Sequence, residues 1–362
     1  MSNTASQPLL GLGVVGLHEG TTMLVAASTR TTHIRAVAGC DTNPDKIASA
    51  RTRCPQVWFT DDYAAMLDRD DVDVVSIFTP DELHGRQIVQ AFEAGKHVIC
   101  TKPIVNTIED AQRVLQASKT TGRRLLVGQS TRFFESFACQ RADFEQGAVG
   151  ELELVDAHYT HRMDWFYDKS PWAVNTTDWV FLGLSHPVDL IRWYLGPIAS
   201  VHALGTRTAL ARRYGVAGFD LYTVNFTAAD GRIGRCMGNY GLHELPRARN
   251  AIELMLYGSA GSSLAQYHDM RYLCTKPDGT ECLQDMLYAK REYYFNNEVH
   301  GMHYGEFANY ADSFARGILA DHPCSPELEE GIETFIVMEA IRQSAADGGR
   351  VIEIAPLLKQ IF

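Results

Sequence analysis

The first 130 residues alternate between short apolar runs and helical patterns, and this order restricts the fold more than any other feature. The apolar runs have the length and composition of buried strands and lie at 9–17, 33–40, 57–59, 72–78, 98–100 and 125–129. Helical patterns separate them, as at 21–28 and 108–120. Strands that alternate with helices pair in parallel, so we predict a doubly wound parallel sheet.

A glycine-rich sequence follows the first predicted strand. Gly11, Gly13 and Gly16 match the pattern G-x-G-x-x-G, but the first two fall inside the strand, whereas a dinucleotide-binding fingerprint needs its glycines in the turn. We therefore place the turn at Gly16, with His18 and Glu19 in the loop that follows. His18 then stands where a second glycine would let a pyrophosphate approach the backbone.

An aspartate, Asp41, ends the second predicted strand. A carboxylate at this position accepts hydrogen bonds from both ribose hydroxyls of an adenosine and repels a 2′-phosphate. No arginine follows it directly, so the sequence favours NAD over NADP as the cofactor. The alternative is that Asp41 only caps the turn made by Asp-Thr-Asn-Pro.

A lysine, Lys102, ends the apolar strand at 98–100 and precedes Pro103. Proline lacks a backbone donor and biases the preceding residue away from helix, so strand pairing should stop here. Lys102 is then expected at the carboxyl edge of the sheet, where open α/β sheets bind their ligands. The alternative is a surface lysine that merely ends a strand.

Strand patterns follow one another in the second part of the chain. They lie at 151–161, 201–204, 221–226, 233–237, 251–257 and 263–267, with turns at 229–231 and 277–279. Strands in succession predict an antiparallel sheet separate from the parallel one. We place the boundary near residue 131, which gives two domains, 1–131 and 132–362.

Aromatic and charged side chains crowd the predicted loop at 161–172, which suits a sugar with apolar faces and hydroxyl groups. Trp165 and Trp172 are the candidate substrate contacts, and the alternative is that the loop packs its aromatic rings against its own domain. The histidine pairs 158/161 and 300/303 lack a convincing third ligand, so we predict no metal site.

The composition argues against several classes of function. The net charge is −11 and no run of Lys and Arg exceeds two residues, which disfavours nucleic acids and anionic membranes as partners. We find no signal-peptide pattern and no stretch of transmembrane length. The eight cysteines are scattered without a Cys-x-x-Cys pair, so we expect reduced thiols in a cytoplasmic protein.

These motifs, taken together and in order, resemble the glucose–fructose oxidoreductase/inositol dehydrogenase (Gfo/Idh/MocA) family over nearly the whole chain. The resemblance is carried by Gly16-Leu17, Thr79-Pro80 with His84, Gly95-Lys96-His97-Val98 running into Lys102-Pro103, Val127-Gly128 before Arg132-Phe133, Gly183–Asp189, Trp193–Gly196, Phe314–Leu319 and Ala340–Val351.

The resemblance implies an α/β plus α+β protein: an N-terminal Rossmann domain and a C-terminal domain with a large, open, mostly antiparallel sheet. Members are mostly NAD(P)-dependent dehydrogenases of sugars and polyols. Others act as epimerases, isomerases or glycosidases with a retained cofactor. On this basis we expect further cofactor contacts at Thr79, Pro80, His84, Lys102, Pro103 and Gln129.

The same resemblance implies a catalytic pair, Lys102 and His186, facing each other across a domain cleft. His186 has the pKa range of a general base for a hydroxyl proton, and Lys102 can steady the developing alkoxide. The sequence departs from the family at Thr101, where glutamate is common, at His18, where glycine is usual, and at Leu182, where many members carry aspartate.

Two further charged residues are candidate substrate contacts with open alternatives. Asp189 follows His186 by one helical turn and either replaces the missing orienting aspartate or only fixes the helix. Arg132 either binds an anionic or polyhydroxy group of the substrate or forms a salt bridge that links the domains.

We therefore expect an NAD-dependent dehydrogenase of a sugar, inositol or sugar derivative. The alternatives are an epimerase or glycosidase that holds NAD tightly, and a catalytically impaired dinucleotide-binding regulatory protein. An open sheet leaves a large face to cover, so we also expect a homo-oligomer, a dimer or tetramer, assembled through the C-terminal sheet.

Overall fold

The computed structural model describes residues 9–29, 31–171, 173–241, 250–267, 269–286 and 305–362. Trp172 and the histidines at 300 and 303 lie outside these ranges. The chain divides into two compact units, one made of Met1–Ser130 with Lys290–Ile332 and the other of Thr131–Ala289 with Glu333–Phe362.

A six-stranded parallel sheet forms the centre of the first unit. Its order is β3-β2-β1-β4-β5-β6, the order of a doubly wound dinucleotide-binding fold, and the pairings between these strands are all parallel. The predicted parallel sheet is therefore confirmed. The strands are β1 (Leu10–Val15), β2 (Ile34–Cys40), β3 (Trp58–Thr60), β4 (Val74–Ile77), β5 (His97–Thr101) and β6 (Leu125–Gly128).

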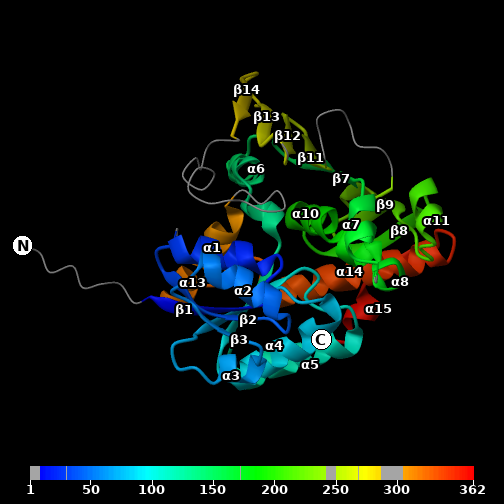
Figure 1. The fold of residues 1–362 in the computed structure, drawn as a ribbon. Coiled ribbons are helices and arrows are strands. Elements are labelled where there is room, and N and C mark those ends of the chain that lie inside the picture. The colour runs from blue at the N-terminus through cyan, green and yellow to red at the C-terminus, as the bar shows by residue number, and fades with distance from the viewer. Residues whose placement is uncertain (1–8, 30, 172, 242–249, 268, 287–304) are drawn as a thin grey trace, which may run out of the picture. The chain divides into compact units, whose positions relative to one another are not determined.

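Helices cover both faces of this sheet. Figure 1 shows α1 and α13 on one face, and α4 and α5 on the other. Strands covered on both sides read as continuous apolar runs, which is why β4 and β5 were recognisable from sequence. The helices are α1 (Gly20–Thr29), α2 (Pro44–Arg53), α3 (Tyr63–Leu67), the 3-10 helix η1 (Asp81–Leu83), α4 (His84–Glu93), α5 (Ile108–Thr121) and α13 (Glu306–Leu319).

Local caps define the ends of these helices. Thr107 accepts a hydrogen bond from the Asp110 N–H at the start of α5, and Gly122 ends the helix with a φ of 67°. A threonine before the first turn and a left-handed glycine after the last are the usual stop signals. The predicted helix at 108–120 is accordingly confirmed to within a residue.

Helix α13 comes late in the chain but belongs to the first unit. It contacts α1, β2 and β6, with Phe307 and Phe314 buried. The sequence pattern placed everything after residue 131 in the second domain, because periodicity shows that a helix has an apolar face but not which sheet that face covers.

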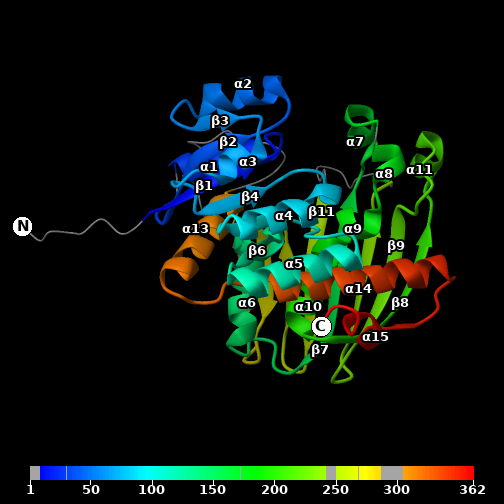
Figure 2. The ribbon, with the colours of Figure 1, turned by 90° about the horizontal axis from the view of Figure 1, so that it is seen from below.

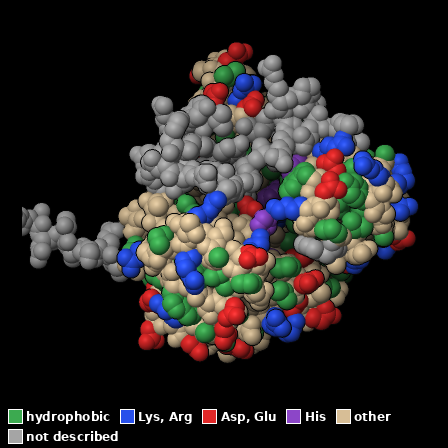
Figure 3. All heavy atoms as spheres, viewed as in Figure 1, with side chains coloured by type: hydrophobic (Ala, Val, Ile, Leu, Met, Phe, Trp, Pro, Cys, Tyr) green, Lys and Arg blue, Asp and Glu red, His purple; other side chains and the backbone are tan. Residues whose placement is uncertain are grey.

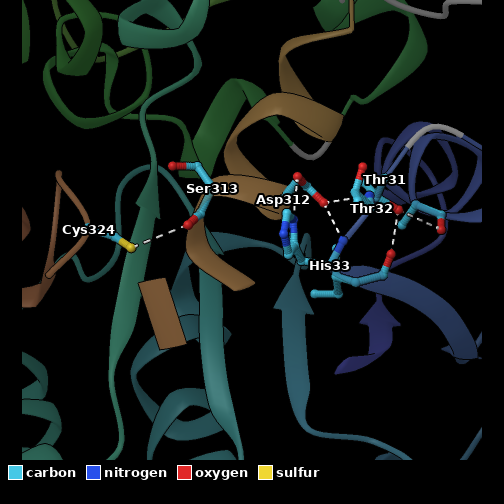
Figure 4. A network of polar contacts seen from close by, with 8 residues as sticks. Thr31, Thr32, His33, Asp312, Ser313 and Cys324 are labelled. Carbon is cyan, nitrogen blue, oxygen red and sulfur yellow. Dashed lines mark hydrogen bonds and ion pairs between the residues drawn. The ribbon is translucent and has the colours of Figure 1, made fainter. Parts of the chain in front are cut away.

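A polar network ties α13 to the loop before β2 (Figure 4). Asp312 Oδ1 accepts the backbone N–H groups of Thr32 and His33, both at 2.6 Å, and Asp312 Oδ2 lies 2.9 Å from His33 Nδ1. Cys324 Sγ lies 3.6 Å from the Ser313 carbonyl oxygen beside it. One carboxylate on α13 thus satisfies two backbone donors that precede a strand.

The second unit is built on a nine-stranded mixed sheet. Its order is β14-β13-β12-β11-β7-β10-β9-β8-β15, and β7 and β10 pair in parallel while the other pairings are antiparallel. Its strands are β7 (Leu152–His161), β8 (Ile198–Thr206), β9 (Leu221–Ala228), β10 (Ile233–Asn239), β11 (Asn250–Gly258), β12 (Ser262–Gln266), β13 (Arg271–Thr275), β14 (Glu281–Asp285) and β15 (Ile352–Glu353).

Helices cover one face of this sheet, and the residues that the structure describes leave the other face open. Strand β9 alternates between exposed and buried residues, as a half-covered strand does. Helix α10 packs on β7 and β10, and Ser344 of α14 accepts the Ala203 N–H of β8; Figure 2 shows both helices. The remaining elements are η2 (Ser130–Phe133), α6 (Glu135–Glu145), α7 (Asp164–Lys169), α8 (Ala173–Thr176), α9 (Trp179–Leu182), α10 (Ser185–Leu195), α11 (Ala209–Tyr214), α14 (Leu328–Ala346) and α15 (Ala355–Leu358).

The arrangement confirms the expected α/β plus α+β fold class. Among the described helices, none combines the length and apolar character of a membrane span. On the face shown in Figure 3, basic side chains are interspersed with acidic ones.

Candidate active site

The turn after β1 is built around Gly16. Its φ is +87° and its N–H donates to the Cys40 carbonyl oxygen at 2.9 Å. A Cβ atom here would lie 2.6 Å from the backbone carbonyl of Phe78, so only glycine fits. Gly11 and Gly13 lie inside β1, as predicted from the position of the strand.

Asp41 lies against this turn. Its Oδ2 accepts the Leu17 N–H at 2.6 Å, and its Oδ1 accepts the Asn43 N–H at 2.9 Å. The carboxylate therefore caps its own turn and is also held beside the glycine turn, so the two interpretations of Asp41 are compatible. A carboxylate at the ends of β1 and β2 is where a dinucleotide-binding fold contacts the adenosine ribose.

Lys102 follows β5 at the same carboxyl edge and is half-buried. Burial lowers the pKa of its ammonium group to about 8, while the carboxylates of Asp81 and Glu19 favour the charged form. Its pKa therefore lies close enough to neutral for the side chain to give up and take back a proton. Glu19 is half-buried and His18 is exposed.

His84 opens α4 and is 1% exposed. Its Nδ1 lies 2.7 Å from the Pro103 carbonyl oxygen, and its Nε2 lies 2.8 Å from the Thr79 carbonyl oxygen. Both ring nitrogens thus contact the backbone of the two loops that follow β4 and β5. This geometry makes His84 a clamp between those loops, one of which carries Lys102.

The other expected cofactor contacts surround this clamp. Thr79 Oγ1 donates to Gln87 Oε1 at 2.5 Å, and Pro80 is exposed. Gln129 follows β6 and is 2% exposed. Gly16, Asp41, Thr79, Lys102 and Gln129 therefore each lie just beyond the carboxyl end of a strand in one sheet.

His186 lies in the second unit, in the first turn of α10, and is 8% exposed. The ring of Tyr159, on β7, meets it edge-on with centroids 5.8 Å apart. Tyr159 Oη lies 3.4 Å from His161 Nδ1, and the His161 ring lies 5.8 Å from Trp165, whose side chain is partly exposed. Trp165 thus belongs to the same aromatic cluster as His186.

Sequence reasoning missed three members of this cluster, Tyr159, Tyr240 and Trp179. Tyr159 and Tyr240 lie 5.4 Å apart, and Trp179 stacks on Tyr240 at 4.5 Å. The usable signal was strand periodicity, because Tyr159 and His161 are two residues apart on β7 and so point to one face. The contact with Tyr240 joins distant parts of the chain and leaves no local signal.

Arg132 and Asp189 bind each other. Arg132 Nε and Nη2 each donate to one carboxylate oxygen of Asp189 at 2.7 Å, and the two side chains are 3% and 1% exposed. The Arg132 guanidinium also lies 5.2 Å from the centre of the Trp193 ring. Both residues belong to the second unit, so this ion pair joins η2 to α10 rather than one unit to the other.

Two of the positions that depart from the family pattern lie at the ends of secondary-structure elements. Thr101 is the last residue of β5 and Leu182 the last of α9. Asp178 caps the start of α9 by accepting the Val180 N–H at 2.9 Å. Within the described residues, no three His, Cys, Asp or Glu side chains are arranged to hold a metal ion.

The two parts of the chain match two models of one family. Residues 10–129 match "Oxidoreductase family, NAD-binding Rossmann fold", and residues 141–263 match the GFO/IDH/MocA C-terminal domain. The chain belongs to the Gfo/Idh/MocA oxidoreductase family. Gly16, which leaves no room for a side chain, and Asp41, held beside it, fit the NAD that this class of domain binds.

Curated relatives in this family share under a third of their residues with the chain. Levoglucosan dehydrogenase of Pseudarthrobacter phenanthrenivorans is 29% identical over 45% of this chain and 43% of its own length. Inositol 2-dehydrogenase of Acidothermus cellulolyticus is 29% identical over 59% of each chain. The chain therefore spans about half the length of these relatives.

Solved structures share the fold over almost the whole chain. An oxidoreductase from Agrobacterium radiobacter, in complex with NAD+, L-tartaric acid and magnesium, has a TM-score of 0.83 and 19% identity over 96% of this chain and 99% of its own. A levoglucosan dehydrogenase in complex with NADH has a TM-score of 0.80 and 22% identity over 95% and 99%.

Proposed function

We propose that this family member is an NAD-dependent dehydrogenase acting on a hydroxyl-bearing carbon of a sugar, an inositol or a sugar derivative. The observation that carries the proposal is Lys102, whose pKa burial lowers to about 8 at the edge of the sheet that carries Gly16 and Asp41. The names of the relatives support the substrate class, since they include levoglucosan and inositol dehydrogenases.

NAD, when bound, supplies the acceptor for the hydride of the substrate carbon. In the proposed mechanism, His186 is the general base for the hydroxyl proton, and Lys102 is the hydrogen-bond donor that stabilises the developing alkoxide. Trp165 and Trp172, the latter outside the described residues, are the proposed contacts for the apolar face of the sugar. Arg132 and Asp189 hold α10, and thereby His186, in place through their mutual ion pair.

We propose NAD rather than NADP because of Asp41. Its carboxylate is held at the glycine turn by the Leu17 N–H, where it would repel a 2′-phosphate. The ratio of kcat/KM with NAD to that with NADP measures the preference. Asp41→Ala should lower this ratio, and an unchanged ratio would contradict the assignment.

The central test is a screen of sugars, inositols and uronic acids with NAD and NADP, followed by reduced-cofactor absorbance. For the best substrate, Lys102→Ala should lower kcat by at least about 10²-fold while NAD binding persists. Lys119→Ala, which removes an exposed lysine from the last turn of α5, is the matched control. Full activity in the Lys102 variant would refute the proposal.

We also propose a cytoplasmic homo-oligomer assembled through the open face of the second sheet. Leu154 on β7 pairs with Ile233 on β10 and with Tyr257 on β11, and this row lies on the face opposite α10. Ile233 and Tyr257 are 53% and 39% exposed, an apolar row that a second copy would cover. Ile233→Lys should shift the mass measured by light scattering towards the monomer.

The eight unpaired cysteines support a reducing compartment.

A further inference from the structure

Three cysteines gather at one edge of the second sheet. Cys274 lies on β13, Cys282 lies on β14, and Cys139 lies on α6, which contacts β13. All three, with Met286, pack around the buried residues Ala148 and Tyr272. Figure 1 shows β13 and β14 at the end of the sheet with α6 beside them. The dehydrogenase chemistry proposed above uses none of these residues.

Two of the cysteines are direct cross-strand partners. Cys274 pairs with Cys282 in the antiparallel register of β13 and β14, so the two side chains leave the same face of the hairpin. Residues directly opposite in such a pair have Cα atoms about 4.5 or 5.5 Å apart. A disulfide spans Cα separations of about 4.4–6.8 Å, and both of these values fall within that range.

The third cysteine reaches the pair through a glutamine. Cys139 Sγ donates to Gln284 Oε1 at 3.7 Å, and Gln284 Nε2 donates to Cys282 Sγ at 3.3 Å. Burial and the carboxylate of Asp143 raise the pKa of the Cys139 thiol, which reduces its thiolate fraction. Cys139 is therefore a poor nucleophile despite its partial exposure.

Exposure separates the two cross-strand thiols. Cys274 is 4% exposed, whereas Cys282 is half-buried on the outermost strand of the sheet. A small oxidant in solution therefore meets Cys282 first, with Cys274 directly behind it as a resolving thiol. Sulfur ligands also bind soft metal ions, but no three described His, Cys, Asp or Glu side chains are arranged to hold one.

We propose that Cys282 and Cys274 form a reversible disulfide when the protein meets a peroxide. The Cys282 thiolate attacks one peroxide oxygen, forms a sulfenic acid and releases hydroxide. The Cys274 thiol then attacks the sulfenic sulfur, and the S–S bond forms as the S–OH bond breaks. The Cys274 proton joins the departing hydroxyl as one water, and the proton that Cys282 lost on ionisation joins the hydroxide of the first step as the other. In total, two thiols and one hydrogen peroxide give one disulfide and two waters.

The cross-link fixes the edge strand β14 to β13. Edge strands are the parts of a sheet that open most readily, because one side lacks a partner. The disulfide closes a short ring across the turn at Lys276–Gly279 and restricts the opening of this hairpin. Its formation is independent of NAD and of the substrate, so it stands or falls separately from the proposed dehydrogenase activity.

The test treats the full-length protein with hydrogen peroxide, blocks the remaining thiols and maps the peptides without reduction. We expect a Cys274–Cys282 peptide, a loss of two hydrogens from the intact mass, and reversal by a dithiol reductant. Cys324→Ser, which removes a half-buried cysteine from the first unit, should leave the disulfide unchanged.

Two further variants separate the roles of the three thiols. In Cys274→Ser, Cys282 should accumulate as the sulfenic acid, which dimedone captures. In Cys139→Ser, the disulfide should form at the wild-type rate. The proposal is overturned if wild-type Cys282 oxidises without pairing, if it pairs with Cys139, or if its oxidation is no faster than that of Cys324.

Discussion

The buried ion pair between Arg132 and Asp189 offers the sharpest test of the second unit. Asp189→Ala removes the carboxylate and leaves the Arg132 guanidinium in a site where its side chain is 3% exposed. Breaking a buried pair by removing one partner costs about 3–5 kcal/mol, because the remaining charge is uncompensated. At about 2–4 °C per kcal/mol for a unit of this size, the melting temperature should fall by about 6–20 °C.

The assay is urea unfolding followed by the fluorescence of the second unit's tryptophans, with calorimetry in parallel. Asp347→Ala is the control, since Asp347 pairs with Arg350 on the surface and the two side chains are 58% and 62% exposed. A surface pair contributes about 0–1 kcal/mol, so this control should unfold almost as the wild type does. The double variant Arg132→Met/Asp189→Leu should recover most of the loss, because it leaves no buried charge.

The same measurement decides between the two interpretations of Arg132. If Arg132 serves the fold, Asp189→Ala lowers the melting temperature, and the double variant restores stability. If Arg132 instead binds substrate, stability changes little in either variant while KM rises. An unfolding midpoint for Asp189→Ala equal to that of the Asp347 control would refute the structural role.

Three further predictions concern the first unit. Gly16→Ala places a Cβ atom against Phe78 and strains a positive φ by about 1–3 kcal/mol, so the NAD dissociation constant should rise about 5- to 150-fold in a fluorescence titration. Asp312→Ala should lower the free energy of unfolding by about 1–3 kcal/mol at neutral pH. Burial raises the pKa of the wild-type carboxyl, but its hydrogen bonds lower it further, so the net pKa is below the usual value. The stability difference between wild type and variant should therefore persist above about pH 4 and disappear below it in acid unfolding curves. Glu19→Gln removes a carboxylate that favours the charged form of Lys102, so the Lys102 pKa should fall below about 8 in the pH dependence of its chemical modification.

The first unit was predictable because its signals are local. Strands covered on both faces must be apolar along their length, and the residues 98–100 show this directly as Val98, Ile99 and Cys100, each 0% exposed. The turn position at Gly16 followed from the same fact, since the strand's length leaves Gly11 and Gly13 inside it. Local sequence thus located both the sheet and the edge that carries Lys102.

The features that could not be predicted join residues far apart in the chain. Arg132 and Asp189 are 57 positions apart, and the sequence offered Arg132 either a substrate group or an ion pair between domains. The observed partner lies within one unit. His84 shows the same limit, because its motif marked it as a cofactor contact while its two ring nitrogens contact the carbonyl groups of Thr79 and Pro103.

The absence of an acidic residue at Thr101 is offset by charges from other loops. Glutamate is common at this position in the family, and without it Lys102 has no carboxylate beside it in sequence. Glu19, after the glycine turn, and Asp81, after β4, both favour the charged form of Lys102 and oppose the effect of burial. The Lys102 pKa of about 8 reflects burial, which lowers it, and these two carboxylates, which raise it. At a sheet edge where several loops meet, carboxylates that follow different strands can therefore set the pKa of a lysine, even where the adjacent residue is a threonine.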